Sequence, residues 1–244
     1  EAMGPIGFTD LDHEGMLIEG FDELNMSITF YNFPYYIEHM ERLGLRKDVD
    51  WVEYQINVPT EMDPRVERIS EHLIKRNGYE LVTYTDRKVL LQDAYVAFKV
   101  IDEAFSVLYG TVPLTDRVID KAIKDYIPLV NLKYICSVKD RQGQIIGFGI
   151  LVPSIAKALK KCNGRMVRGI FRLLKALKGK NDTLEMFFIG ITEEHQKKGV
   201  PAIIMNQIIK VCIENGVKIC ETGPELETNQ NVQSMWKTFD ARNH

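Results

Sequence analysis

The stretch EEHQKKGVPAIIMNQI, residues 193–208, joins a charged loop that contains a glycine to an apolar segment of helical character. The first turn of a helix leaves backbone N–H groups unpaired and carries about half a positive charge. Glycine lets the chain approach a phosphate closely, so such a turn can bind a diphosphate. The expected contributors are Gln196, Lys197, Lys198, Gly199, Val200 and Ala202.

Pro201 stands inside this turn, and proline has no N–H to donate. A hydrogen bond to a charged group contributes roughly 1.5–3 kcal/mol, so the loss of one would weaken binding about tenfold to a hundredfold. Proline is also favoured at the first helical position. Two interpretations therefore stay open: an anion site with one donor fewer, or a solvated loop in which Pro201 only starts the helix.

Glu185 is the candidate proton acceptor nearest to this loop, because it lies in the strand-like stretch TLEMFFIGI, residues 183–191. Strand alternation predicts that Glu185, Phe187 and Ile189 share one face. The charged side chains of residues 193–195 are alternatives. Each also has a plainer interpretation, in which Glu185 faces solvent at the start of its strand and the loop charges are merely solvated.

Several other kinds of chemistry find no support in the sequence. There is no G-x-S-x-G, H-E-x-x-H, Walker or dinucleotide-binding motif, and the five histidines are isolated, so we expect no metal site. A formal net charge of −3 gives no global attraction to nucleic acid. The four cysteines form no CxxC pair, and no apolar run is long enough to span a membrane, so we expect a cytoplasmic protein.

From Tyr79 onward, the pattern predicts an α/β fold. A strand (79–85), two helices (91–110 and 113–130, with Thr115 as N-cap) and a β-hairpin around residues 140–143 come first. A helical insertion, the strand 183–191, a helix over 201–215, a strand over 217–223 and a closing helix over 229–241 follow. Two strands joined by a crossover helix are parallel, whereas a hairpin is antiparallel. The sheet is therefore mixed and mostly antiparallel, with helices on both faces.

Residues 1–59 are predicted to form a separate part. A helix over 31–45 and a strand over 49–58 are expected there, followed by a linker and a helix that lead into the second part, residues 60–244. The sequences GPIGFTD (4–10) and GPELETN (223–229) resemble each other. We interpret this as an internal repeat, with residues 1–59 as the rear half of a truncated related unit.

These motifs, in this order, resemble the GNAT superfamily of acyl-CoA-dependent N-acyltransferases. The loop 196–201 is similar to the family pattern Q/R-x-x-G-x-G/A at a helix start, with Pro201 in the last place. Asn229, Val232, Met235 and Trp236 occupy the positions of the family pattern N-x-x-A-x-x-L-Y. Residues 31–51 also resemble that late helix and its LGF-type ending, and the whole chain looks like an uncharacterised bacterial, tandem GNAT-like group.

The resemblance implies acyl transfer from acetyl-CoA or a longer acyl-CoA to a small-molecule amine. It places the CoA diphosphate on the turn 196–202, the acyl arm against the strand edge around Ile189 and Ile191, and Asn229 beside the cofactor. Glu185 would be the general base. The family's usual acid is a tyrosine, but Trp236 cannot donate a proton to a thiolate. The alternative is therefore a catalytically degenerate GNAT module that binds an acylated ligand or serves as a scaffold.

The insertion at about 154–180 carries nine Lys or Arg residues and no Asp or Glu. Apolar residues recur around it at helical spacing, from Ile155 to Leu177. Three interpretations compete: a solvated helical pair packed on the core, a lid for a long acyl chain whose cations hold the cofactor or an acyl carrier, or a segment that docks on an anionic membrane. The sequence does not choose among them, and it leaves the oligomeric state undetermined.

Overall fold

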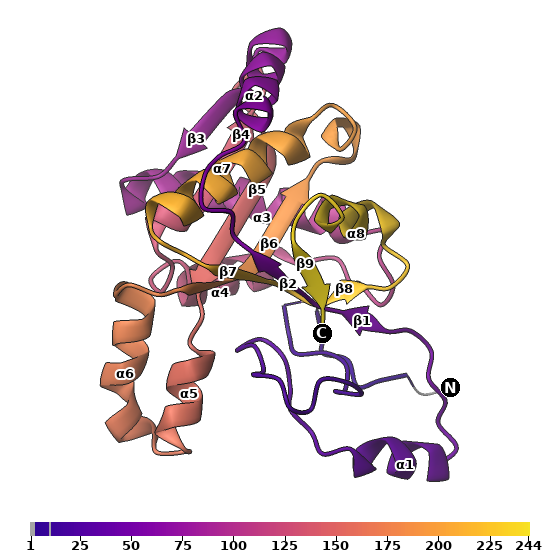
Figure 1. Cartoon of the computed structure of the whole chain (residues 1–244). Helices are drawn as coiled ribbons and strands as arrows, with labels where there is room; N and C mark the ends of the chain where they lie inside the picture. The colour runs from indigo at the N-terminus through magenta and orange to yellow at the C-terminus, as the bar shows by residue number, and fades with distance from the viewer. Residues whose placement is uncertain (1–2, 10) are drawn as a thin grey trace.

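A computed structural model describes residues 3–9 and 11–244, apart from the side chains of Met166 and Arg168. Its centre is a seven-stranded sheet in the order β3-β4-β5-β6-β7-β2-β9 (Figure 1). The strands are β3 (Glu80–Thr83), β4 (Ile135–Lys139), β5 (Ile145–Pro153), β6 (Thr183–Ile191), β7 (Ile219–Thr222), β2 (Tyr54–Asn57) and β9 (Ala241–Asn243). Only β6 and β7 are parallel neighbours, so the predicted mixed, mostly antiparallel sheet is confirmed.

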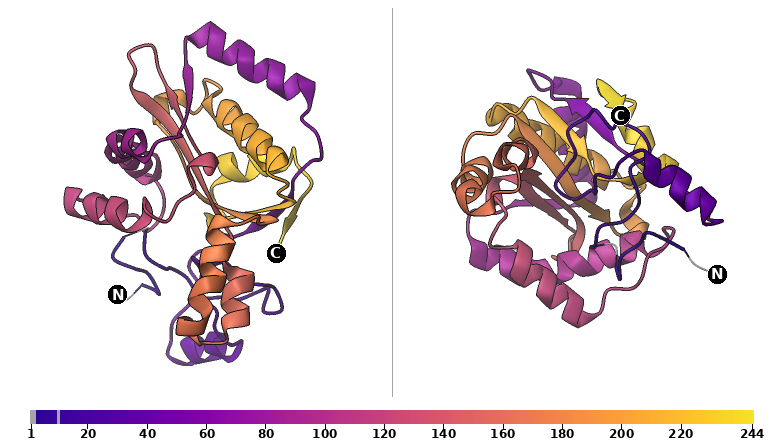
Figure 2. Two further views of the ribbon diagram at one scale, coloured as in Figure 1. Left: turned by 90° about the vertical axis from the view of Figure 1, so that its left-hand side faces the viewer. Right: turned by 90° about the horizontal axis from the view of Figure 1, so that it is seen from below.

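Helices cover both faces of the sheet, as Figure 2 shows. The helices α3 (Arg87–Phe105) and α4 (Asp116–Tyr126) lie on one face, and α2 (Pro64–Asn77) and α7 (Val200–Glu214) lie on the other. Each pair encloses a core. Leu90, Ile101 and Ile119 are fully or almost fully buried on the first face, and Ile203 and Ile204 are fully buried on the second.

The other elements complete the chain. They are α1 (Tyr35–Arg42), β1 (Trp51–Val52), η1 (Leu132–Tyr134), α5 (Ala156–Cys162), α6 (Met166–Lys178), η2 (Glu193–His195), β8 (Glu225–Leu226) and α8 (Gln230–Trp236). Thr115 caps α4 as predicted, because its side chain accepts a hydrogen bond from the Val118 amide. No helix in the described part of the chain combines the length and apolar character needed to cross a bilayer.

A β-bulge in β6 changes which side chains share a face. The pairing with β5 shifts between Ile150 and Leu151, which leaves Phe187 as an extra residue in β6. Phe187 and Phe188 therefore both pack on the side of α3 and α4. Ile189 packs on the side of α7, so the prediction that it shares a face with Glu185 and Phe187 is wrong.

The two parallel strands separate beyond the middle of β6. Residues Thr183–Met186 pair with Ile219–Thr222, where β7 ends. The rest of β6, residues 187–191, pairs with β5 alone among the described strands. The other backbone edge of this segment therefore pairs with no described strand, at the place where the sequence predicts an acyl arm.

The first 59 residues contribute directly to the sheet of the remainder. The strand β2 lies between β7 and β9 and is antiparallel to both. The predicted closing helix is too long, because α8 ends at Trp236 and the chain then forms β9. Membership of residues 1–59 in a second, truncated unit stays a prediction, although their strand completes this sheet.

Candidate functional site

The turn between β6 and α7 is built around Gly199. This residue is the N-cap of α7 and has φ of 87°, a conformation that L residues with side chains rarely adopt. A Cβ atom here would also lie 2.7 Å from the methyl groups of Leu73 in α2. Both the backbone conformation and the close packing of α2 therefore require glycine, as the motif predicts.

Some amides of the turn are already bonded and others are not. The amides of Gln196 and Lys198 donate to the carbonyl groups of Glu193 (3.4 Å) and His195 (3.1 Å). Pro201 is in the first turn of α7. The amides that form no hydrogen bond with the part of the chain that the structure describes are those of Lys197, Gly199, Val200 and Ala202. The turn is therefore not closed, but it offers fewer donors than predicted.

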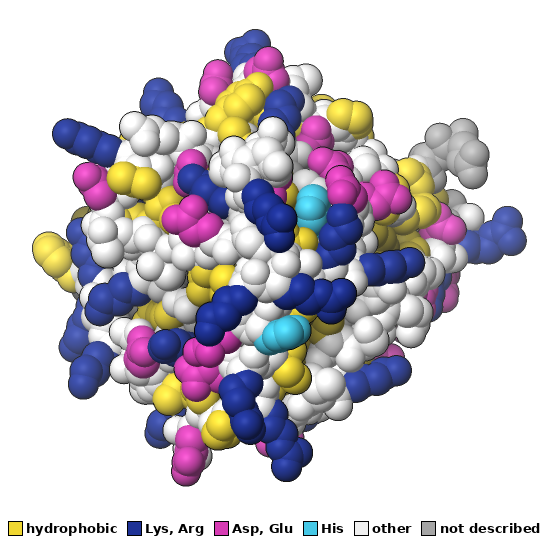
Figure 3. Space-filling model, turned by 90° about the horizontal axis from the view of Figure 1, so that it is seen from above, with side chains coloured by type: hydrophobic (Ala, Val, Ile, Leu, Met, Phe, Trp, Pro, Cys, Tyr) yellow, Lys and Arg dark blue, Asp and Glu magenta, His cyan; other side chains and the backbone are white. Residues whose placement is uncertain are grey.

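Gln196, Lys197 and Lys198 have exposed side chains at the upper end of the molecule in Figure 1, whereas Val200 is fully buried. Lys198 forms an ion pair with Glu194 at 2.6 Å, which lowers the pKa of Glu194 and raises that of Lys198. Lys197 is exposed and forms no ion pair with the described residues. Figure 3 shows this end from above, where basic and acidic side chains are interspersed. Lys197 is thus the freer of the two predicted cations.

The two isoleucines predicted to hold the acyl arm lie on the open segment of β6. Their side chains point toward α7, so only their backbone faces the gap beside β7. The side-chain amide of Gln196 donates to the carbonyl of Ile191 at 3.4 Å, which links the turn to the end of the strand. The turn and the open edge therefore form one continuous surface.

Glu185 is fully buried, which excludes the interpretation that it faces solvent. Its Oε2 accepts a hydrogen bond of 2.7 Å from the Ser27 hydroxyl, and its Oε1 has no hydrogen-bond partner among the described residues. Burial raises the pKa of Glu185, while the hydroxyl groups of Ser154 and Ser27 act in the opposite direction. A buried carboxylate of raised pKa with an unused oxygen is suited to accept a proton.

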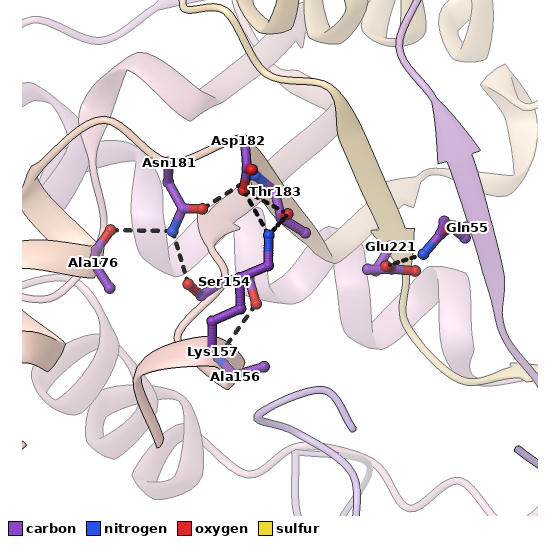
Figure 4. Close-up of polar contacts among 9 residues, drawn as sticks. All are labelled: Gln55, Ser154, Ala156, Lys157, Ala176, Asn181, Asp182, Thr183 and Glu221. Carbon is purple, nitrogen blue, oxygen red and sulfur yellow. Dashed lines mark hydrogen bonds and ion pairs between the residues drawn. The ribbon is translucent and has the colours of Figure 1, made fainter. Parts of the chain in front are cut away.

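A row of polar side chains continues from Glu185 across three neighbouring strands. Glu185 in β6 is the partner of Glu221 in β7, which is the partner of Gln55 in β2, and Gln55 is the partner of Arg242 in β9. Gln55 Nε2 donates to Glu221 Oε1 at 2.9 Å, as Figure 4 shows. Arg242 forms an ion pair with Glu23 at 2.6 Å.

Glu53 and His244 extend this polar row. His244 Nε2 lies 3.0 Å from Glu221 Oε2, and this hydrogen bond raises the pKa of His244. Burial raises the pKa of Glu53 to about 7; the neighbouring charge of His244 opposes this, while Glu221 and Glu185 reinforce it. The charge of Glu221 thus raises the pKa of both Glu53, between β1 and β2, and Glu185 in β6.

The predicted residues near the final helix have structural roles. Asn229 is the N-cap of α8, because its Oδ1 accepts from the Val232 amide at 3.4 Å. The indole Nε1 of Trp236 lies 2.8 and 2.9 Å from the two carboxylate oxygens of Glu225. Burial raises the pKa of Glu225 to about 7, and the Trp236 bond opposes this rise.

The sequence analysis did not identify the groups that surround Glu185. Glu221 and Glu53 each interrupt a stretch of β-forming residues, ICET and WVEYQ, and this was the available signal. A single glutamate in a short strand is uninformative until the register is known. Ser27 lies 158 residues from its partner, and no local pattern connects the two.

A sequence comparison finds a relative among curated proteins. Protein YghO of Escherichia coli (strain K12) is 21% identical over 248 residues, covering 98% of this chain and 62% of that protein. The chain thus spans less than two thirds of the length of this relative. No family model matches the chain.

Solved structures give the clearer comparison. One is the GCN5-related glucosamine N-acetyltransferase region of a fungal multi-domain GH3 β-N-acetylglucosaminidase, with a TM-score of 0.55 and 10% identity over 86% of this chain and 21% of that chain. Another is a tandem GNAT protein from the clavulanic acid biosynthesis pathway, with a TM-score of 0.50 and 11% identity over 88% of this chain and 57% of that chain. The fold of this chain is that of the GNAT superfamily.

Proposed function

We propose that the chain is an N-acyltransferase that transfers an acyl group, acetyl or longer, directly from acyl-CoA to a small-molecule amine. The observation that carries this proposal is the open edge of β6. It runs from the free amides of the turn toward the buried carboxylate of Glu185. Glu185 and Ile191 are six residues apart, which is about 20 Å of extended strand. An extended CoA arm fits along such an edge.

The residues fit the two ends of the cofactor. The amides of Lys197, Gly199, Val200 and Ala202, with the Lys197 ammonium, would hold the diphosphate at the positive end of α7. The unpaired backbone edge of residues 187–191 would hold the acyl arm by strand-like hydrogen bonds. CoA supplies the activated thioester.

Glu185 would move the proton of the acceptor. An amine reaches the site as an ammonium ion and must lose one proton before its nitrogen can form the new bond to the acyl carbon. The Glu185 carboxylate accepts this proton, and the neutral nitrogen then bonds to the acyl carbon while the carbon–sulfur bond breaks. The nitrogen gives its second proton to the leaving thiolate, so that the products are the amide and the free CoA thiol. Glu185 returns its proton to solvent. Trp236 takes no part, because it is buried and bonded to Glu225.

The acceptor is best described as a cationic amine. The row beside Glu185 contains Glu221 and Glu53, while Arg242 pairs with Glu23 and His244 pairs with Glu221. With Glu185, the four carboxyl groups outnumber the two basic side chains of the row. Such a site favours an ammonium group over a neutral or anionic one. In this structure the Ser27 hydroxyl donates to Glu185, so an acceptor would replace this contact with its own N–H.

Calorimetric titration with acetyl-CoA and with palmitoyl-CoA tests the cofactor assignment. Pro201→Ala adds one amide donor and should tighten binding about tenfold to a hundredfold. Pro59→Ala, in the exposed linker after β2, is the matched control and should change nothing. If neither thioester gives heat with the wild-type chain or with Pro201→Ala, the proposal is overturned.

A non-catalytic module is the second candidate, and three observations favour it. Pro201 removes a donor from the turn, Trp236 replaces the family's acid, and Ser27 covers Glu185. Such a module would bind acyl-CoA without releasing free thiol in the presence of amines. Thiol release measured across a panel of primary amines therefore separates the two candidates.

A further inference from the structure

The hairpin formed by α5 and α6, residues 154–180, leaves one apolar side uncovered. Four residues spaced i, i+3, i+4 and i+7 along α6 form a stripe with exposed fractions between 42% and 89%. They are Val167, Ile170, Phe171 and Leu174. The other side of α6 closes the hairpin, since a Cβ at Gly169 would lie 2.2 Å from the Cys162 sulfur. The interpretation that Ile170, Phe171 and Leu174 pack on the core is thus wrong.

The same hairpin carries a strong positive charge. Its nine Lys and Arg residues are accompanied by no Asp or Glu within 154–180. Among the basic side chains described there, Lys157 alone forms an ion pair, with Asp182 at 2.9 Å. The exposed ones include Lys160, Lys161, Arg165, Arg172, Lys175 and Lys178. An exposed apolar stripe flanked by unneutralised cations is the pattern of a helix that lies at a lipid–water interface.

The base of the hairpin is fixed to the sheet. The side-chain amide of Asn181 donates to the carbonyl groups of Ser154 (2.7 Å) and Ala176 (3.3 Å). Figure 4 shows these bonds together with the Lys157–Asp182 pair. The hairpin is therefore held in one orientation relative to the sheet. Figures 1 and 2 show that it projects below the sheet.

A run of exposed aromatic residues lies at the same end of the molecule. Residues 30–36 lead into α1, which lies at the lower end of the molecule like the hairpin, but on the opposite side in Figure 1. Five of these residues are between 44% and 57% exposed: Phe30, Tyr31, Phe33, Tyr35 and Tyr36. Aromatic rings with a polar edge accumulate at membrane interfaces. The hairpin and this run thus both place exposed apolar groups at the lower end of the molecule.

We propose that this end of the molecule docks on an anionic membrane surface. The stripe of α6 enters the headgroup boundary, the Lys and Arg side chains bind lipid phosphates, and the aromatic run provides a second contact. Charge complementarity decides between occupants, because a second copy of this chain would bring the same positive charge to the interface. The inference does not depend on acyl transfer, and binding is measured without substrate.

Co-sedimentation with vesicles tests the proposal. The wild-type chain should bind vesicles of phosphatidylcholine mixed with phosphatidylglycerol much more tightly than vesicles of phosphatidylcholine alone, and added salt should weaken that binding. Val167→Ser with Phe171→Ser should reduce binding at least tenfold. Lys160→Gln with Lys161→Gln should reduce it to a similar extent, only on anionic vesicles. These side chains are exposed, so circular dichroism should show an unchanged fold.

The matched control lies on α2, at the opposite end of the molecule in Figure 1. Ile69→Ser with Lys75→Gln removes one exposed apolar and one exposed basic side chain there and should leave binding unchanged. The proposal is overturned by equal sedimentation with both vesicle types, or by full binding of the α6 variants. It is also overturned if the wild-type chain ignores vesicles but binds an acidic acyl carrier protein, or self-associates through the stripe.

Discussion

The two halves of one sheet face are covered in opposite ways. Over β3, β4 and β5, the helices α3 and α4 bury an apolar half that contains Leu90, Ile101 and Ile119. Over the start of β6 and over β7, β2 and β9, the segment 20–28 covers a polar half through contacts such as Ser27–Glu185 and Glu23–Arg242. The bulge at Phe187 marks the border. The first half holds the fold together, and the second keeps the Glu185 carboxyl group away from bulk water.

This contrast separates stability from chemistry. Burial of apolar side chains stabilises the fold without regard to direction, whereas a buried carboxylate is useful only if its partners leave one oxygen unused. Glu185 meets that condition. We therefore expect substitutions in the polar half to change rate and pH dependence, and substitutions in the apolar half to change the free energy of unfolding.

The largest expected effect is that of Glu185→Gln in the polar half. The amide cannot accept the proton of the amine, so kcat should fall about 10²- to 10⁴-fold. The residual rate of the variant should keep rising with pH, because only the fraction of amine that is already neutral can react. Steady-state kinetics of thiol release measure both. A variant that keeps the wild-type rate would remove Glu185 from the mechanism.

The next effect concerns the apolar half. Ile119→Ala leaves a cavity under α4 and should lower the free energy of unfolding by about 2–5 kcal/mol. In the polar half, Glu221→Gln keeps an acceptor for Gln55 but loses the ion pair with His244, so it should cost about 1.5–3 kcal/mol. Urea unfolding of both variants makes the comparison. Equal losses would show that the polar half contributes to stability in the same way as the apolar half.

A third prediction uses the pH dependence of stability. Burial raises the pKa of Glu53 from 4.5 to about 7, so between these values the folded chain binds more protons than the unfolded chain. The stabilisation from this group is therefore complete below about pH 4.5 and is lost as the pH rises toward 7. A shift of this size corresponds to about 3 kcal/mol.

Glu53→Gln should reduce this decline, as shown by urea unfolding at pH 5 and at pH 8. Glu80→Gln, on the exposed surface of β3 in the other half, is the control and should leave the decline unchanged. Burial also raises the pKa of Glu225 to about 7, so Glu225 adds its own loss of stability with rising pH, and both variants retain that loss. If the free energy of unfolding falls equally between pH 5 and pH 8 for Glu53→Gln and Glu80→Gln, Glu53 does not cause the pH dependence.

The order of elements was predictable because each has a local signal. Thr115 marks the start of α4, Gly199 marks the start of α7, and the alternating or apolar stretches mark β3 to β7. The three-residue strand β9 has no such signal and follows a helix closely. The bulge at Phe187 was also not predictable, because the stretch TLEMFFIGI has the pattern of an unbroken strand.

The candidate site was predictable only where it is local. The loop 196–202 and Glu185 lie within one strand–turn–helix unit, so motif and spacing were sufficient to select them. The partners of Glu185 come from β7, from β2 and from the segment near Ser27, and their meeting depends on register and long-range packing. Such contacts follow from the whole fold, and no window of sequence contains them.

The smallest expected effect tests the contact that closes the polar half. The Ser27 hydroxyl donates to Glu185 and lowers its pKa, so Ser27→Ala should raise that pKa further. The acid limb of the pH–rate profile would then move to higher pH, with a loss of less than about tenfold at any fixed pH on that limb.

At high pH, where Glu185 is ionised in both proteins, the rates of Ser27→Ala and wild type should converge, since the variant alters only the protonation of the base. Carbon NMR titration of labelled glutamate carboxyls gives an independent reading of the same shift. Ser234→Ala, which removes an exposed hydroxyl on α8, should move neither measurement. A rate loss that persists equally at all pH values would instead mean that Ser27 positions a substrate. The polar half would then act by binding the substrate, and Ser27 would not act through the pKa of Glu185.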